Sequence, residues 1–230
     1  LPGTSVGLQA RSKPLGYSGH MLLLLATACS LPTQEAGATG ATDLERARAF
    51  YAAQPSYLQP LPFASVPEGL PDLRSSTCGG CHSAIYAEWS KSAHAHAWLD
   101  DLQFQAELRK ETEGGGDVKW MCVNCHTPLE NQLERLVVST DGSLDRPVYI
   151  GNPGFDAALQ LDAIGCAACH VREGAVRGPW GDPDGLAPHP VVQSEELTAS
   201  SLCNSCHQAQ AHFKDINLAC VFSTGEEHAS

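Results

Sequence analysis

Hydrophobic residues in this chain are gathered in short runs, and the stretches between them are interrupted by proline and glycine. The densest run, Met-Leu-Leu-Leu-Leu-Ala-Thr-Ala at residues 21–28, is far too short to span a membrane. Residues 29–73 include six prolines and room for one short helix over residues 46–53. That helix would begin at Thr42-Asp43-Leu44-Glu45, a capping box, and we expect the rest of the segment to be an extended tether.

The remainder of the chain predicts short helices and long loops. A helix is expected from about residue 83 to residue 110, and a second begins at Thr127-Pro128-Leu129-Glu130, a capping box with proline in its first turn. Residues 137–140 and 147–150 flank Asp141-Gly142 and predict a small hairpin. Short helices are expected at residues 155–163 and 195–212, with a Gly- and Pro-rich loop at 171–193. The predicted fold class is mainly α, with long loops and little β.

Composition and charge narrow the function. Hydrophobic residues make up 43% of the 230 residues and charged residues 17%, which excludes a disordered or collagen-like chain. Lys and Arg number 14 against 26 Asp and Glu, so the net charge of −12 argues against binding to nucleic acid or anionic lipid. Aromatic residues are scarce at 7%, which predicts a thin side-chain core, whereas ten cysteines and ten histidines are unusually many.

Eight of the ten cysteines fall in four identical frames. These are Cys78-Gly-Gly-Cys81-His82, Cys122-Val-Asn-Cys125-His126, Cys166-Ala-Ala-Cys169-His170 and Cys203-Asn-Ser-Cys206-His207. Chance would give roughly 0.02 such pentapeptides in a chain of this composition. Two thiols three positions apart can each add to one vinyl group of a porphyrin, and the next residue can put an imidazole nitrogen on the iron. Zinc sites and thioredoxin-like pairs also use Cys-x-x-Cys, but neither explains a histidine after every pair. The sequence predicts four covalent haem c groups that fill the core of a multihaem cytochrome fold.

Each iron then needs a sixth ligand. The motifs use four histidines as proximal ligands, which leaves His94, His96, His189 and His212 once His20 (in the leader) and His228 (two residues from the end) are set aside. Methionine is nearly excluded, because Met21 lies in the leader and Met121 abuts Cys122. Ligation by two histidines at low potential is therefore expected.

Spacing constrains which iron each candidate serves. On the predicted helix His94 and His96 lie about 200° apart, so they cannot share one iron, and His94 is carried roughly 18 Å from His82. His94 should therefore serve a haem other than that of His82. His212 follows His207 by five residues and could serve only another haem, whereas His189 is held between two prolines.

Haem attachment of this kind implies export. Arg11 and Lys13 precede the apolar run, and Ala26-Thr27-Ala28-Cys29 resembles a bacterial lipoprotein signal in which Cys29 carries the lipid. Ordinary signal cleavage and an uncleaved anchor are the alternatives. The predicted organisation is a signal peptide at 1–28, the tether at 29–73 and a tetrahaem domain at 74–230, in a periplasmic protein anchored to the outer membrane of a bacterium.

The sequence of the C-terminal region indicates that the chain is truncated there. Cys220 is the odd cysteine if Cys29 is lipidated, and a Cys29–Cys220 disulfide is the alternative. Residues 225–230 end without a closing element, so further haem modules are expected to follow.

The first motif continues as Tyr86-x2-Trp89-x2-Ser92-x-His94, and this run resembles the opening module of the cytochrome c-554-like multihaem cytochromes. The resemblance covers about residues 76–215, although the later motifs match only at the haem frame. It implies haems stacked in close pairs and a carrier role in nitrogen or other anaerobic metabolism. It also implies that His94, and not His96, is a distal ligand to a different haem, and that one haem can lack such a ligand.

The predicted function is electron transfer between redox proteins through closely packed haems with two histidine ligands each. An acidic surface suits a partner with a basic docking face. One alternative is a multihaem reductase or oxidase acting on nitrite, nitric oxide or hydroxylamine at a five-coordinate haem, and another is a subunit of an extracellular cytochrome filament. The ligand count favours a carrier over an enzyme, and no catalytic residue is assigned.

Overall fold

The computed structural model describes residues 40–110, 115–213 and 218–229. The described residues all belong to one compact unit, and residues 1–35 lie outside them. The predicted signal peptide and Cys29 therefore lie outside the described residues as well. None of the described helices combines the length and hydrophobicity that crossing a bilayer requires.

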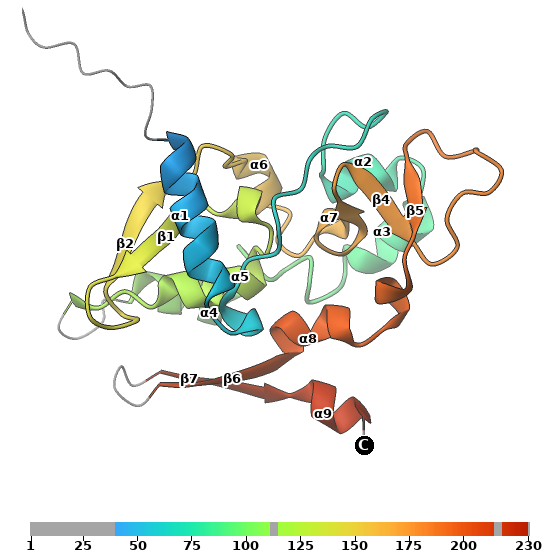
Figure 1. The fold of residues 1–230 in the computed structure, drawn as a ribbon. Coiled ribbons are helices and arrows are strands. Elements are labelled where there is room, and N and C mark those ends of the chain that lie inside the picture. The colour runs from blue at the N-terminus through green and yellow to red at the C-terminus, as the bar shows by residue number, and fades with distance from the viewer. Residues whose placement is uncertain (1–39, 111–114, 214–217, 230) are drawn as a thin grey trace, which may run out of the picture. The chain divides into compact units, whose positions relative to one another are not determined.

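Most helices of the compact unit are one or two turns long (Figure 1). They are α1 (Gly40–Ala52), α2 (Ser75–Gly79), α3 (Ser83–Trp89), α4 (Leu102–Arg109), α5 (Lys119–His126), α6 (Ala157–Gln160), α7 (Cys166–His170), α8 (Ser201–His207) and α9 (Thr224–Ala229). Single 3-10 turns lie at η1 (Ser56–Leu58), η3 (Glu130–Gln132) and η4 (Glu195–Thr198).

Seven strands in the described part of the chain form three small sheets. The strands are β1 (Arg135–Thr140), β2 (Pro147–Gly151), β3 (Val171–Arg172), β4 (Ala175–Gly178), β5 (Val191–Gln193), β6 (Gln208–Phe213) and β7 (Leu218–Ser223). β1–β2 and β6–β7 are antiparallel pairs, and β4 pairs antiparallel with β3 and parallel with β5. The fold is thus mixed helix and sheet, with more strand than the expected mainly α class.

The predicted hairpin is confirmed as β1–β2, in which Arg135 pairs with Gly151 and Thr140 with Pro147. Gly142 has a φ of +84°, a conformation that glycine adopts without strain, but the loop is longer than Asp141-Gly142 alone, since the Arg146 N–H donates to the Ser143 carbonyl and the Asp141 N–H donates to the Arg146 carbonyl. The expected helix at 155–163 is confirmed as the shorter α6, whose N-cap Asp156 accepts hydrogen bonds from two backbone N–H groups.

The long helix predicted over residues 83–110 is wrong. α3 ends at Trp89, a series of turns follows over residues 90–100, and α4 starts afresh behind Asp101, whose side chain accepts a hydrogen bond from the Phe104 N–H at 2.9 Å. Within the turns, the Ser92 hydroxyl accepts a hydrogen bond from the Ala95 N–H. Such side chains offer the backbone partners other than a helix. His94 and His96 therefore do not share a helix.

Two other helix predictions also need correction, because distant segments take the backbone groups that a helix would use. The segment after His126 forms the single turn η3, since the Leu61 N–H donates to the Pro128 carbonyl and the Leu61 carbonyl accepts from the Glu130 N–H. The helix expected over 195–212 ends at His207, and the chain continues as β6 because it pairs with β7. Part of the loop expected at 171–193 forms β3, β4 and β5.

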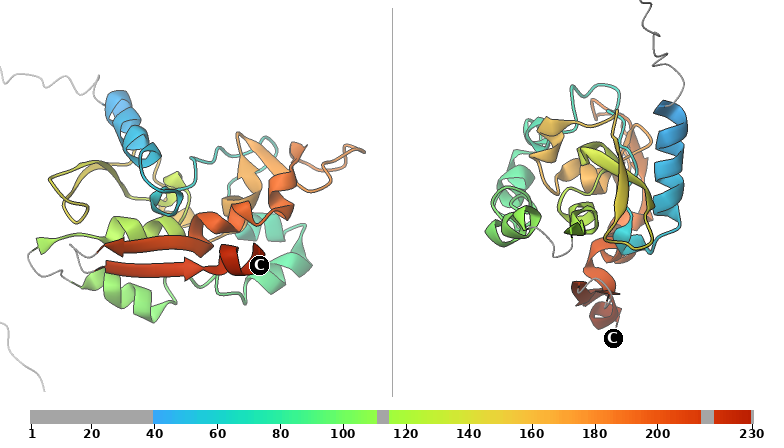
Figure 2. Two further views of the ribbon diagram at one scale, coloured as in Figure 1. Left: turned by 60° about the horizontal axis from the view of Figure 1, so that its bottom comes forward. Right: turned by 90° about the vertical axis from the view of Figure 1, so that its left-hand side faces the viewer.

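The helix expected at residues 46–53 is confirmed within α1, but α1 is part of the core. Ala47 and Tyr51 are buried against Trp120, Leu136 and Val137. Figures 1 and 2 show α1 lying alongside β1. The compact unit thus extends across the expected boundary between tether and domain at residues 73 and 74.

A second cluster of buried residues lies under the third motif. Its members are Ala64, Leu73, Leu129, Leu159, Ala167, Ala168 and Val171. Two alanines of the motif itself, Ala167 and Ala168, belong to it, so α7 is anchored by its small residues. The cysteines and the histidine of the same helix are left at the side of the core, where they are half-buried or exposed.

Candidate haem sites

Each Cys-x-x-Cys-His frame lies on a helix or directly before one. α5, α7 and α8 all end on the histidine of their motif, at His126, His170 and His207. The first motif spans α2 and the following turn, and His82 stands directly before α3. In the three helical motifs the first cysteine and the histidine are four residues apart, so they lie on one face of the helix.

The fold brings the four motifs together in pairs. The thiols of Cys78 and Cys166 lie close enough to shift each other's pKa, and this proximity joins the first motif to the third. The thiols of Cys125 and Cys206 join the second motif to the fourth in the same way. Cys169 also lies close enough to Cys206 for their charges to interact, so the third motif neighbours the fourth.

The pKa values of the motif cysteines are shifted in both directions, since the neighbouring Cys78 thiol lowers the pKa of Cys166 to about 6. Burial raises the pKa of Cys122 to about 11 and also raises the pKa of Cys169. Zinc binds thiolates, and in the described residues no group of three or more Cys, His, Asp or Glu side chains is placed to hold a metal ion. The zinc alternative therefore has no ligand cluster in this part of the chain.

Two of the proximal histidines are already oriented for a metal ion. His126 Nδ1 lies 2.6 Å from the Ala97 carbonyl oxygen, and His170 Nδ1 lies 2.9 Å from that of Arg177. A carbonyl can only accept, so each Nδ1 carries the proton and each Nε2 is left free to bind iron. Phe104 stacks on the His126 ring at a centroid distance of 3.7 Å and holds it further. These residues fit covalently bound haem c.

His94 lies beside the fourth motif. Its ring centre is 6.2 Å from that of His207. The distance shows that the two rings are neighbours at the fourth motif. His94 is itself exposed, and partial desolvation by its surroundings and then the neighbouring His207 lower its pKa, which favours the neutral imidazole that a metal ion binds.

The same segment is tied to the third motif. The Trp89 indole N–H donates to the Ile164 carbonyl at 3.0 Å, and the Ile164 N–H donates to the His94 carbonyl at 3.2 Å. Ile164 stands two residues before Cys166. Trp89 thus positions the segment that carries His94, a role beyond the core packing that an aromatic residue usually has.

The other distal candidates are placed less distinctively. His96 is exposed, and its Nδ1 lies 2.6 Å from an Asp100 carboxylate oxygen. His189 is half-buried with Nδ1 3.5 Å from the Pro190 carbonyl, and His212 is exposed on β6 opposite Ala219. These three remain predicted ligands.

Sequence reasoning missed a hydrogen-bonded link between the first and third motifs. An Asp162 carboxylate oxygen accepts hydrogen bonds from the Ser75 N–H at 2.8 Å and the Ser75 hydroxyl at 2.6 Å, and the Ser75 oxygen accepts from the Cys166 N–H at 2.9 Å. Residue 165 must be glycine, because a Cβ there would lie 2.2 Å from the Asp162 carboxylate. Serine at the first turn of a helix is a recognisable pattern, but Asp162 has no local signal.

Residues 77–148 match the family model described as cytochrome c554 and c-prime. This match confirms the resemblance to the cytochrome c-554-like family. It spans the first two motifs and most of the β1–β2 hairpin, about a third of the chain. No curated protein and no solved structure matches the chain. A cytochrome c of this family is an electron-transfer haem protein, and its haem c is covalently bound.

Proposed function

We propose that this protein is an exported tetrahaem c-type cytochrome that passes electrons between redox proteins. The observation that carries the proposal is the placement of four Cys-x-x-Cys-His frames in one compact unit, with thiols meeting across the first and third motifs and across the second and fourth. Four haems attached there would be neighbours, as an electron-transfer chain requires.

The chain's own residues have separable roles in this function. Bound haem supplies reversible one-electron chemistry at its iron. The cysteine pairs would hold each porphyrin, and the histidines that would bind the irons next to them are His82, His126, His170 and His207. The carbonyls of Ala97 and Arg177 hold two of these imidazoles in one tautomer. Histidine at the distal positions as well, with no methionine ligand, keeps the potentials low.

We propose His94 as a distal ligand to an iron other than that of His82. Its ring lies beside His207 of the fourth motif, and its carbonyl is bonded to the residue that leads into the third motif. Both observations support service to one of these two haems. His189, His96 and His212 are the further candidates for the remaining irons.

Location and partner follow from the sequence. We propose a periplasmic protein anchored to the outer membrane through lipid on Cys29. The net charge of −12 suits a redox partner with a basic docking face, and association should weaken as salt screens the charges. Nucleic acid is not an expected partner.

The proposal is tested by counting covalent haems. Mass spectrometry of the denatured protein should find four haem masses retained, because thioether bonds survive unfolding. Peptide mapping should assign one haem to each cysteine pair. A variant with Cys122→Ser and Cys125→Ser should retain three. A protein that retains no haem, or that carries zinc instead, would overturn the proposal.

A further inference from the structure

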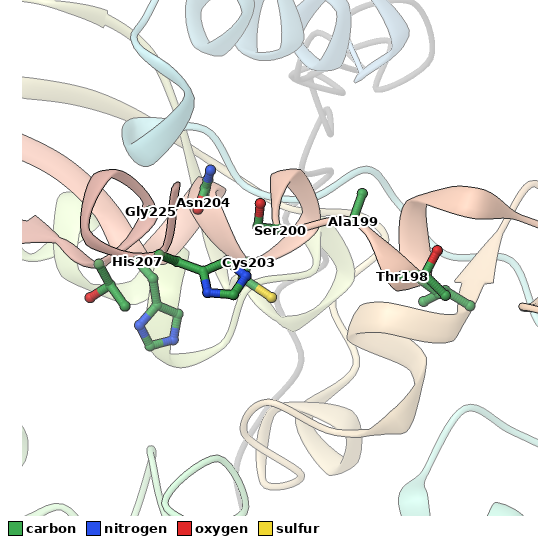
Figure 3. A pocket seen from close by; sticks show the side chains of 10 residues that line it. Thr198, Ala199, Ser200, Cys203, Asn204, His207 and Gly225 are labelled. Atoms are coloured by element: carbon green, nitrogen blue, oxygen red, sulfur yellow. The ribbon is translucent and has the colours of Figure 1, made fainter. Parts of the chain in front are cut away.

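A cleft of about 480 Å³ lies beside the fourth motif, between α8 and α9. Cys203 and His207 of α8 line it, as Figure 3 shows, and so does His228 of α9. Ligand pockets range over roughly 300–1,000 Å³, so the volume suits a bound group of substantial size. His228 is two residues from the end of the sequence, and for that reason it was not predicted as a ligand from the sequence.

The cleft lies on the side of α8 that a haem would occupy. Cys203 and His207 are four residues apart, and both contribute to its wall. A porphyrin attached at Cys203, with His207 on its iron, would extend into this space. An imidazole that lines the same space is available to that iron.

α9 is held close to α8 by its own contacts. The Glu226 N–H donates to the Gln208 side-chain oxygen at 3.1 Å, directly after His207. Gly225 packs so tightly that a Cβ there would lie 2.5 Å from the Asn204 side-chain oxygen. His228 is thus on a helix anchored at the fourth motif.

His207 now has two imidazoles near it, His94 and His228, but one iron has only one position left after His207 binds. His94 does not line the cleft, and its backbone is bonded to Ile164 at the entry to the third motif. We propose that His228 is the distal ligand of the fourth haem, which leaves His94 to the third. This inference rests on the proposed haem attachment at Cys203 and Cys206.

The test is the spin state of the haem-loaded protein. His228→Ala should convert one haem of four from low spin to high spin in the electron paramagnetic resonance spectrum, and added imidazole should restore it. His228→Met should keep that haem low-spin and raise its midpoint potential, since a methionine ligand does so. Glu226→Ala, on the exposed side of the same helix, is the matched control and should leave every haem low-spin.

A double variant separates the two imidazoles. His94→Ala with His228→Ala should give two high-spin haems if the residues serve different irons, and a count of one would overturn the assignment. Mass spectrometry first establishes whether the peptide that contains Cys203 and Cys206 carries a haem. If it carries no haem, the proposed function fails together with the inference, whereas a haem there that stays low-spin in His228→Ala overturns the inference alone.

Discussion

Asp162 shows how one residue can link two attachment sites that are 88 positions apart in the sequence. Its carboxylate bonds both polar groups of Ser75, which is fully buried, and Ser75 in turn receives the Cys166 N–H. Burial raises the pKa of Asp162, while the hydrogen bonds from Ser75 oppose the rise. The carboxylate stays in place because its partners, the Ser75 N–H and hydroxyl at the start of α2, are otherwise unsatisfied donors.

Asp162→Ala should therefore destabilise the haem-loaded protein by about 1–3 kcal/mol, the usual cost of leaving a buried donor without an acceptor. Asp162→Asn keeps a carbonyl acceptor and should lose less. Denaturant unfolding measures both, with the exposed Asp141→Ala as a control expected within about 0.5 kcal/mol of the parent. Equal stability of Asp162→Ala and the parent would show that the link contributes nothing.

The haem frames could be recognised from the sequence because their chemistry depends on spacing along a single helical turn. The partners of those frames could not be. Nothing near Cys78 indicates that it meets Cys166, and Asp162 matters only through a contact that the fold creates. His94 was found by its distance from the first motif, yet its neighbour His207 is a tertiary result.

At the scale of elements, the sequence predicted a structure correctly where neighbouring residues determine it, and failed where distant segments do. The glycine at residue 142, with a φ of +84°, lies in the β1–β2 loop, as the sequence predicted. The helix expected over 83–110 failed because Asp101 caps a new helix and the intervening turns hold Trp89 and His94 against Ile164. β6 was missed because its pairing partner, β7, shares no sequence pattern with it.

The sequence predicted that residues 29–73 form a tether with one short helix, whereas in the structure α1 is part of the hydrophobic core. Tyr51 is buried in the cluster around Trp120, and its hydroxyl accepts a hydrogen bond from the Val137 N–H at 3.2 Å. Tyr51→Ala should lower the free energy of unfolding by about 3–5 kcal/mol, as for other large aromatic residues truncated in a core. Exposed Glu45→Ala on the same helix is the control and should change little.

Thermal or denaturant unfolding of the haem-loaded protein measures both variants. If Tyr51→Ala unfolded with the parent, residues 40–52 would be a tether in solution. The element would then contribute nothing to the domain that carries the motifs.

At the scale of the molecule, the hydrophobic core formed by side chains is small. The two clusters of buried residues are small, and large apolar side chains stand in solvent, among them Ile85, Leu102, Trp180 and Leu186. Trp180 and Leu186 are each 83% exposed. A chain that completes its interior with porphyrins would show this pattern, because the faces of the rings supply the apolar surface that the side chains lack.

The number of irons with an open position decides between a carrier and a reductase, since a substrate must bind the metal directly. His94, His96, His189 and His212 would suffice for four irons, and His228 adds a fifth imidazole. We therefore expect no spectral change when the ferrous protein is exposed to carbon monoxide. Nor do we expect turnover of nitrite, nitric oxide or hydroxylamine.

His228→Ala provides the positive control for that experiment, because removing a distal ligand should let one haem bind carbon monoxide stoichiometrically. Comparing it with the parent shows whether the assay can detect a single open iron among four. Stoichiometric binding by the parent itself, together with turnover of one of the three substrates, would establish the reductase. An acidic surface would oppose that chemistry for nitrite, since it repels an anion on approach, whereas it favours docking of a basic redox partner.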